Sequence, residues 1–475
     1  MRGTVTGRTL SVMRTSRSSL LIVPLLAASA CASSGAADTL GARGDVAPTQ
    51  PRATATTPPS WTGYHGGGAH LGYSSTTPAV TTLRRPWTRP LDGKVYGSPL
   101  VIGNRVIAAT ENNTVYALDR STGRVLWSRH LATPARLSHL PCGNIDPLGI
   151  TGTPVFDPAT QRIFAVTTAA SGSSLAHLLW GLDVSTGRTG VRVSADVPGQ
   201  NALVENQRGA LALSRGRVLI PYGGHAGDCG NYHGYLVSTT TAGTDKRIFR
   251  TGTQREAGMW QAAGAAVNPT TGTAYVVSGN GSATSGAWDG SDSVNAVDPV
   301  RATRLSYFAP RGWAQENAVD ADLGSSGVAL LSNGNLWIQG KTSTGYVLSQ
   351  TALGGIGGQR RTITGACAKQ FGGPAVHGTV VYAPCTDGVR RINTTATQPL
   401  GWKAPSNLTG SPVVGGGAVF VLDPSGGTLS ALSESTGRLI SRVPVGVTTR
   451  FATPALSGSM LFVPTQTGIS AVSGA

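Results

Sequence analysis

Five cysteines are the residues of this chain whose type most directly implies chemistry. They stand at Cys31, Cys142, Cys229, Cys367 and Cys385. A structural zinc site is typically built from pairs such as Cys-x-x-Cys, and no such pair occurs in the sequence. His225 and His233, which flank Cys229 in the sequence, are more typical of loop histidines than of metal ligands. We therefore expect disulfides among the four cysteines that follow Cys31, with three pairings possible.

The first 60 residues carry the signals of export. Residues 1–19 contain arginine and no acid, and the apolar run 20–30 is too short to span a bilayer, so we predict a signal peptide over 1–30. The sequence Ala28-Ser29-Ala30-Cys31 resembles a bacterial lipobox, which predicts a diacylated Cys31. The alternative is a free secreted chain. Residues 31–60 then form a flexible Ala, Ser, Thr and Pro tether. We expect a location at the outer face of the cytoplasmic membrane, or secretion.

The formal net charge of +16 arises from 38 basic and 22 acidic residues. The arginines are scattered singly and are not interleaved with aromatic residues, so the sequence does not predict nucleic-acid binding. An anionic envelope surface or wall polymer is a better match for such a charge. Serine-hydrolase elbows and phosphate-binding Gly-x-x-x-x-Gly-Lys loops are missing from the sequence.

The elements that must position these residues are short strands. The 475 residues include 65 Gly and 28 Pro, with 40% hydrophobic and 13% charged residues, which disfavours long helices and a disordered chain alike. An all-β secreted protein fits this composition best.

Internal repeats are the strongest signal. Residues 98–127 and 411–440 share one template of four short strands, with Ser-Pro at the start and Ser-Thr-Gly before the fourth strand. Weaker copies begin at Thr153, Gly373 and Thr453 and near Ala210, Ala265 and Val328. The last copy has room for only three strands, and residues 83–91 stand where its fourth strand belongs. We predict a single propeller domain over 61–475 with eight four-stranded antiparallel blades, closed by this N-terminal strand.

The Trp61 opening (WTGYHGGGAHLGY), the Ser/Thr-Pro strand starts and the LDxSTGxxxW blade ends resemble the PQQ-like, or quinoprotein-type, eight-bladed β-propeller repeat family. This resemblance covers nearly all of the mature chain. The family includes quinone-dependent alcohol and sugar dehydrogenases and also non-catalytic propellers such as the outer-membrane assembly lipoprotein, so the fold does not choose between these functions.

In an up-and-down blade, the strand 2 to 3 loop and the connection to the next blade open on one face. The long insertions of this sequence, such as 130–148 and 223–233, all fall on that face, where we expect binding. The four later cysteines lie in loops of the same face. We therefore pair Cys142 with Cys229 and Cys367 with Cys385.

Three fragments are similar to motifs of the quinone-dependent dehydrogenases, which use Ca²⁺ and an aspartate base. By that similarity, Asn280 of VSGNG matches a Ca²⁺ ligand, Asp322 matches the general base with Asp320 as second candidate, and Lys341 matches the residue that contacts pyrroloquinoline quinone. The sequence also departs from the enzymes: it has no adjacent Cys-Cys pair and no Cys-x-x-Cys-His haem site, and Glu205 is only a weak match for the glutamate ligand.

A plain structural role is the alternative for each of these residues. Asn280 would begin a turn, Asp322 would cap a strand and Lys341 would be solvated. Trp260, Trp288 and Trp313 are candidates for the floor of a pocket, or else pack between blades.

From these observations we predict a monomeric, lipid-anchored propeller that acts as a binding or scaffolding module at the cell surface and engages an envelope protein or cell-wall component. The alternative is an oxidoreductase that depends on pyrroloquinoline quinone and Ca²⁺ and acts on alcohols or sugars. A purely structural assembly factor is a third possibility.

Overall fold

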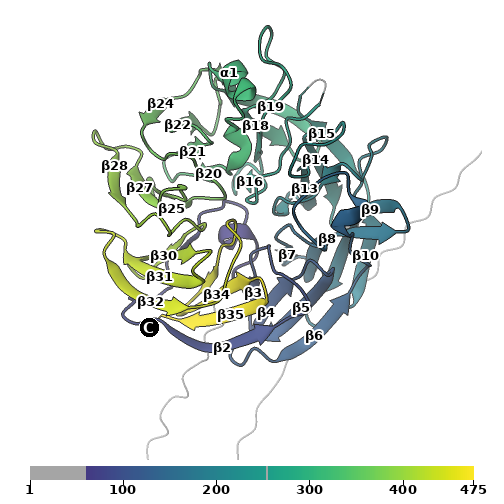
Figure 1. Ribbon diagram of the computed structural model, residues 1–475, viewed down its shortest axis with the longest axis vertical. Helices are drawn as coiled ribbons and strands as arrows, with labels where there is room; N and C mark the ends of the chain where they lie inside the picture. The colour runs from purple at the N-terminus through teal and green to yellow at the C-terminus, as the bar shows by residue number, and fades with distance from the viewer. Residues whose placement is uncertain (1–59, 253–254, 475) are drawn as a thin grey trace, which may run out of the picture. The chain divides into compact units, whose positions relative to one another are not determined.

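The computed structural model describes residues 60–252 and 255–474, which form a ring of eight β-sheets (Figure 1). The predicted signal peptide, Cys31 and the tether lie outside the described residues, apart from Ser60. Among the described residues, no helix has both the length and the apolar character needed to cross a bilayer.

Each sheet is one blade, and the first four follow one another in chain order. Blade 1 consists of β3 (Leu100–Ile102), β4 (Arg105–Ala109), β5 (Thr114–Asp119) and β6 (Val125–His130). Blade 2 consists of β7 (Val155–Asp157), β8 (Arg162–Ser171), β9 (Ser174–Asp183) and β10 (Thr189–Ser194). Blade 3 consists of β12 (Ala212–Ser214), β13 (Arg217–Gly224), β14 (Tyr235–Thr240) and β15 (Arg247–Arg250), with β11 (Glu205–Asn206) paired to the end of β13. Blade 4 consists of β16 (Ala266–Val267), β17 (Ala274–Ser278), β18 (Ser293–Asp298) and β19 (Thr303–Ala309).

The next three blades repeat the same order. Blade 5 consists of β20 (Ala329–Leu330), β21 (Asn335–Gln339), β22 (Thr344–Ser349) and β24 (Arg361–Thr364). Blade 6 consists of β25 (Ala375–His377), β26 (Val380–Ala383), β27 (Arg390–Asn393) and β28 (Leu400–Lys403). Blade 7 consists of β29 (Val413–Gly415), β30 (Ala418–Asp423), β31 (Thr428–Ser433) and β32 (Leu439–Pro444).

Blade 8 closes the ring as the incomplete last repeat predicts. Its inner strands are β33 (Ala455–Ser457), β34 (Met460–Thr465) and β35 (Gly468–Ser473), and β2 (Arg84–Pro90) pairs antiparallel with β35 as the fourth strand. The eight-bladed, closed all-β fold is therefore confirmed. Three short strands go beyond the four-strand plan: β11 pairs antiparallel with β13, and β1 (Tyr73–Ser74) and β23 (Gly355–Ile356) join β29 and β19 in parallel. The helical elements are short: η1 (Tyr64–Gly66), η2 (Leu137–His139), α1 (Trp313–Ala318) and η3 (Leu323–Ser325).

A contact between neighbouring blades explains why the repeats share Trp and Ser-Thr-Gly. The indole N–H of Trp127, on the outer strand of blade 1, donates to the carbonyl of Val184 in blade 2 at 3.1 Å. The same ring covers Gly187 so closely that a Cβ there would lie 2.7 Å from it. Trp87 covers Gly123 and Trp402 covers Gly437 in the same way. The tryptophan of one blade thus packs on the glycine turn of the next.

The segment that precedes β2 ties the inner strands together. Trp61 pairs with Val101 of blade 1, and the carbonyl of Gly68 accepts the N–H of Val267 in blade 4 at 2.6 Å. The carbonyl of Leu71 accepts the N–H of Val376 in blade 6 at 2.7 Å. This segment therefore connects blades that are far apart in sequence, which helps to fix the positions of the loops above them.

Candidate functional site

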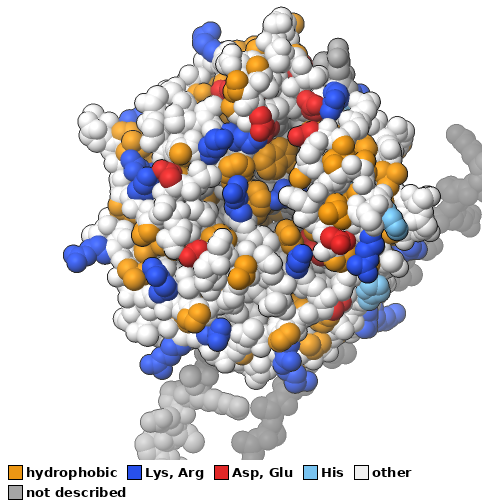
Figure 2. All heavy atoms as spheres, viewed as in Figure 1, with side chains coloured by type: hydrophobic (Ala, Val, Ile, Leu, Met, Phe, Trp, Pro, Cys, Tyr) orange, Lys and Arg blue, Asp and Glu red, His pale blue; other side chains and the backbone are white. Residues whose placement is uncertain are grey.

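A pocket of about 340 Å³ opens between the long loops of blades 3, 4 and 5. Figure 2 shows the face on which it lies, with a hollow bordered by cationic and acidic side chains. The residues that give the pocket its chemistry are Arg208, Tyr232, Trp260, Asn280, Asp322 and Lys341.

The blade plan explains why these residues meet. Tyr232, Asn280 and Lys341 each follow the second strand of a blade, after β13, β17 and β21 respectively. Trp260 and Asp322 lie on connections that lead from one blade to the next. Both kinds of loop open on the same face of a propeller, so residues from three blades converge there.

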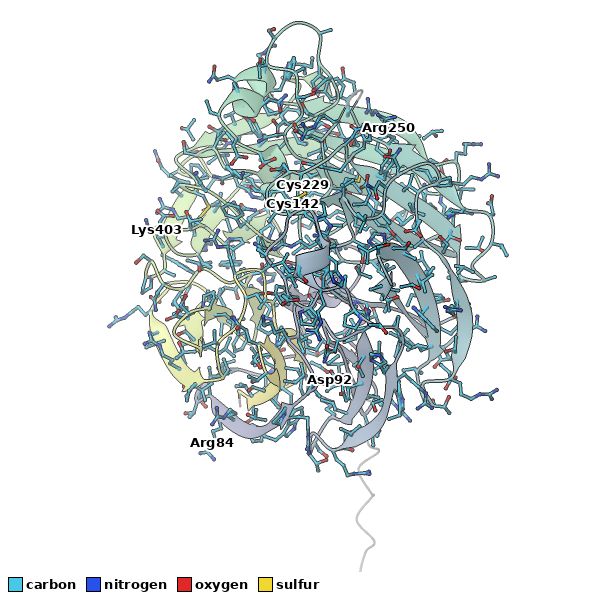
Figure 3. The ribbon with its side chains drawn as sticks, turned by 45° about the vertical axis from the view of Figure 1, so that its right-hand side comes forward. Arg84, Asp92, Cys142, Cys229, Arg250 and Lys403 are labelled. Carbon is cyan, nitrogen blue, oxygen red and sulfur yellow. A yellow bond between two sulfur atoms is a disulfide. The ribbon has the colours of Figure 1, made fainter. Side chains whose placement is uncertain are left out.

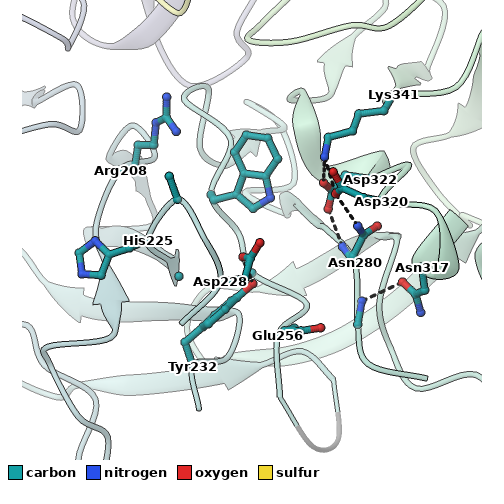
Figure 4. Close-up of a pocket in the computed structure, with 15 residues that line it drawn as sticks. Arg208, His225, Asp228, Tyr232, Glu256, Asn280, Asn317, Asp320, Asp322 and Lys341 are labelled. Atoms are coloured by element: carbon teal, nitrogen blue, oxygen red, sulfur yellow. Dashed lines mark hydrogen bonds and ion pairs between the residues drawn. The ribbon is translucent and has the colours of Figure 1, made fainter. Parts of the chain in front are cut away.

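The centre of the pocket is a network around Asp322 (Figure 4). The Nζ of Lys341 lies 2.5 Å from Asp322 Oδ2 and 2.6 Å from Asp320 Oδ1. The main-chain N–H of Asn280 donates to Asp322 Oδ1 at 2.6 Å, and its side-chain Nδ2 donates to Asp320 Oδ1 at 2.9 Å. The Asp322 side chain is 7% exposed and that of Lys341 12%, so this pair is largely removed from water.

Close backbone approach makes this network possible. A Cβ at Gly279 would lie 2.3 Å from Asp322 Oδ1 and 2.9 Å from Trp260 Nε1. Any side chain at position 279 would therefore push Asp322 or Trp260 away. The Gly-Asn step of the VSGNG fragment has a steric role as well as a chemical one.

Burial and charge shift the pKa values in the pocket. Burial raises the pKa of Asp322, although the charge of Lys341 opposes this shift. Burial lowers the pKa of the Lys341 ammonium, but the charges and hydrogen bonds of Asp322 and Asp320 outweigh it, so the pKa is raised. Burial also raises the pKa of Glu256 and lowers that of Arg208 to about 10. Such shifts are common at functional sites and also occur in structural ion pairs.

Three acidic residues at the pocket have left-handed backbone conformations. The φ angles of Asp228, Glu256 and Asp320 are 49°, 70° and 54°. Aspartate tolerates this region better than most residues, but each conformation still has an energetic cost. Local strain of this kind concentrates at binding sites, where the surrounding structure holds it in place.

One aromatic face in the pocket lies between two cations. Arg208 Cζ and Lys341 Nζ each lie 6.0 Å from the centre of the Trp260 ring. The pocket also contains the carboxylates of Asp228 and Glu256. Asp228 accepts the hydroxyl of Tyr232 at 2.6 Å, and Glu256 pairs with Arg255 at 2.8 Å. The arrangement suits a flat ligand that stacks on Trp260 and carries a negative group toward Arg208, since Lys341 is already paired with Asp320 and Asp322.

The structure places Asn280, Asp320, Asp322 and Lys341 in this one pocket. It also separates the three tryptophans. Trp260 lines the pocket, whereas Trp288 stacks on Tyr307 at 4.2 Å and Trp313 is buried at 6% exposure.

Sequence reasoning missed several lining residues. Arg208, Tyr232, Asp228, Glu256 and Asn317 belong to no recognisable motif. A signal was nevertheless present, since four of them lie on loops of the elaborated face and Asn317 lies on α1, within a long insertion on that face.

The donor set does not fit a Ca²⁺ ion, which takes six to eight oxygen ligands. The Oδ1 of Asn280 is buried and accepts no hydrogen bond from the described residues, so this atom is available. Both oxygens of Asp322, however, already accept Asn280 N–H and Lys341 Nζ. Glu205 does not line the pocket, since its carboxylate accepts the N–H of His233 at 3.3 Å. Within the described ranges, no three His, Cys, Asp or Glu side chains are arranged to hold a metal.

Two disulfides stiffen the loop-bearing face, with the predicted pairing. Cys142 joins the connection between blades 1 and 2 to the β13–β14 loop at Cys229, as Figure 3 shows, and Cys367 joins Cys385 across blade 6. The β13–β14 loop also carries His225 and Asp228, which line the pocket. The first disulfide therefore anchors one wall of the pocket.

Comparison with known proteins gives the same architecture. Residues 80–221 match the family described as outer membrane protein assembly factor BamB. No curated protein matches the sequence.

Solved structures share the fold at low sequence identity. Quinohemoprotein alcohol dehydrogenase from Comamonas testosteroni is 14% identical with a TM-score of 0.69, over 87% of this chain and 80% of that one. A europium-containing methanol dehydrogenase is 14% identical with a TM-score of 0.64, over 87% of this chain and 98% of that one. BamB from Moraxella catarrhalis is 15% identical with a TM-score of 0.56, over 82% and 97%. At these identities the similarity shows the fold alone.

Proposed function

We propose that this protein, an eight-bladed propeller of PQQ-like repeats, is an exported binding module that holds a small, flat, anionic ligand in the pocket of blades 3 to 5. The observation that carries this proposal is the Trp260 ring with Arg208 and Lys341 each 6.0 Å from its centre. A propeller that only joined other proteins would not need two partly buried cations beside an aromatic face.

Several features support export and anchoring. Two disulfides are typical of an oxidising compartment. The lipobox-like sequence at Cys31 would attach the chain to the outer face of the cytoplasmic membrane, where the tether would hold the propeller above the lipid. The ligand would come from another envelope component or from the surrounding medium.

A quinone-dependent oxidoreductase is the second candidate, and the convergence of Asn280, Asp322 and Lys341 favours it. If a quinone were bound, it would supply the acceptor for the hydride equivalent, two electrons and one proton, that leaves the alcohol carbon. Asp322 would take the hydroxyl proton, since its carboxylate lies in the pocket, and Lys341 would balance the charge that develops beside it. We assign no step to Ca²⁺, because the oxygen donors of this pocket do not fit a Ca²⁺ site.

The test uses pyrroloquinoline quinone as probe, added to the full chain with and without Ca²⁺. Calorimetry measures binding and an artificial electron acceptor measures turnover of alcohols and sugars. We expect stoichiometric binding that is weakened by Trp260→Leu and Arg208→Gln. Trp288→Leu is the matched control, because Trp288 stacks on Tyr307 outside the pocket.

The outcomes separate the two candidates. Binding without turnover supports the binding module, and turnover lost in Asp322→Asn supports the oxidoreductase. If neither this quinone nor simpler aromatic dicarboxylates bind at millimolar concentration, the proposed ligand class is wrong.

A further inference from the structure

The fourth strands of the eight blades share a charge pattern that is not apparent when the sequence is read residue by residue. In blade 4 the fourth strand, β19, is followed in its sheet by the uncharged β23 (Gly355–Ile356). Each fourth strand carries at least one Lys or Arg, and none carries Asp or Glu. In chain order the strands are β2, β6, β10, β15, β19, β24, β28 and β32, and their cations are Arg84, Arg85, Arg89, Arg129, Arg192, Arg247, Arg250, Arg304, Arg361, Lys403 and Arg442. We call this set the basic belt.

The basic belt faces solvent. Arg89 and Arg361 are half-buried, and the other belt residues are exposed. The outline of the molecule in Figure 2 carries many cationic side chains, and Figure 3 shows Arg84 and Lys403 at its outer edge. Carboxylates partner two belt residues, since Arg247 pairs with Asp245 at 2.7 Å and Lys403 with Asp387 at 2.7 Å.

The acidic residues lie elsewhere in each blade. Asp119, Asp183 and Asp298 end the third strands, where Asp119 and Asp183 accept hydrogen bonds from the Ser-Thr-Gly turns. A second group, including Asp228 and Asp322, lies at the pocket. The charged residues on the fourth strands are therefore all cations, although carboxylates such as Asp245 lie beside them on neighbouring turns.

Protection of sheet edges does not account for this pattern. Charged side chains on an edge strand prevent aggregation, and acidic residues can serve that purpose as well as basic ones. Eight strands of one sign match the recognition of a polyanion, and the guanidinium groups that carry most of this charge can bind phosphate oxygens in a bidentate geometry.

The arrangement around the ring indicates the form of the partner. A flat bilayer touches only a few neighbouring blades of a convex rim, and the cations on the opposite side would remain unused. A flexible chain of phosphates can follow the rim and contact successive blades. We propose that the basic belt binds a flexible linear polyanion of repeating phosphate groups, such as a phosphodiester-linked wall polymer. This binding is separate from the ligand pocket.

The test measures binding of long-chain inorganic polyphosphate to the full chain as a function of salt. The belt variant combines Arg84→Gln, Arg85→Gln, Arg129→Gln and Arg192→Gln, which lie on three consecutive blades of the ring. The control variant combines Arg136→Gln, Arg311→Gln, Lys369→Gln and Arg450→Gln, four exposed cations on the connections between blades. Both variants lose the same charge.

We expect the belt variant to bind polyphosphate at least about tenfold more weakly at low salt, and the slope of log affinity against log salt to fall by roughly 3. The control variant should lose less than about threefold. Both variants should unfold at the same midpoint temperature as the unaltered protein, which would show that each is folded.

Three results would overturn the proposal. Equal losses in the two variants would mean that net charge alone attracts the polymer. Vesicles of anionic phospholipid that bind more tightly than polyphosphate at equal phosphate concentration would indicate a membrane surface instead. Absence of polyphosphate binding by the unaltered chain at low salt would remove the belt as a binding site.

Discussion

Lys341 contacts Asp322 twice, since its Nζ lies 2.5 Å from Asp322 Oδ2 while its main-chain N–H donates to the Asp322 carbonyl at 2.9 Å. The two residues come from different blades, Asp322 from the connection before blade 5 and Lys341 from the loop after β21 within it. The pair therefore fixes the blade 5 wall of the pocket against the connection from blade 4. The ion pair between the side chains neutralises the Asp322 carboxylate, and the main-chain hydrogen bond holds the two loops together.

Replacement of Lys341 by Met should destabilise the protein by about 3 kcal/mol near neutral pH, because it leaves the buried Asp322 carboxylate without its cation. Burial already holds the pKa of Asp322 above its ordinary value, and loss of Lys341 raises it further. An acid with a raised folded-state pKa loses stability as pH rises. Urea unfolding at pH 5 and pH 8 should therefore show a larger defect at pH 8.

The double variant Lys341→Met with Asp322→Asn is the control for that prediction. It removes the titrating group as well as its partner, so its stability defect should be the same at both pH values. An equal defect of the single variant at pH 5 and pH 8 would show that Asp322 does not carry the effect.

Glu205 and Glu111 should lower stability as the solution becomes alkaline. Burial raises the pKa of Glu205 to about 8 and that of Glu111 to about 7, so the folded state keeps protons that the unfolded chain has released. Stability is then fully present below the unfolded pKa and falls as pH rises toward these values. Between pH 7 and pH 8, Glu205→Gln should flatten the decline more than Glu111→Gln, because Glu205 keeps more of its proton over this interval. Denaturant unfolding at half-unit intervals measures both slopes, and identical slopes would contradict the assignment.

Removal of the Cys142–Cys229 bridge should weaken ligand binding, because that bridge anchors the loop with His225 and Asp228. We expect Cys142→Ala with Cys229→Ala to reduce probe affinity by about tenfold through added loop freedom. The stability loss should be about 4 kcal/mol for this 87-residue separation. Cys367→Ala with Cys385→Ala is the matched comparison, since neither residue lines the pocket. Calorimetry that finds equal affinity losses in both variants would refute the local role.

The tryptophan and glycine contact between blades should be costly to break. Gly187 has a φ of +69°, and a Cβ there would lie 2.7 Å from Trp127. Gly103 has a φ of +56°, and a Cβ added there would have no neighbouring atom within 4 Å. Gly103→Ala should therefore cost only the backbone term, about 1 kcal/mol, and Gly187→Ala at least roughly 2 kcal/mol more. Thermal unfolding compares the two, and similar values would show that Trp127 moves aside without loss.

Local pattern was enough to predict the fold. Alternating apolar residues, Ser-Pro starts and Ser-Thr-Gly turns report on single blades, and the short last repeat required a strand from the other end of the chain. The strand around Trp87 fills that place. The pairing of Cys142 with Cys229 followed because the blade plan puts all four cysteines on one face and places Cys367 and Cys385 in the two loops around blade 6.

The candidate site was predictable only in part. Similar motifs pointed to Asn280, Asp322 and Lys341, and the structure brings these three together. Arg208 and Tyr232 gave no such signal, because each stands alone in its loop. Glu205 was only a weak match in sequence, and the structure places it outside the pocket, with its carboxylate accepting the N–H of His233.

The sequence by itself determined the number of blades and the face that carries the long loops, since both depend on residues close together in the chain, and it determined the closure of the ring because the last repeat is one strand short. The tertiary structure alone decided that Lys341 neutralises Asp322, that Arg208 reaches Trp260 and that singly scattered arginines gather on the fourth strands of the blades. These relationships join residues of different blades, and their distances depend on how the blades pack around the ring, which no local pattern encodes.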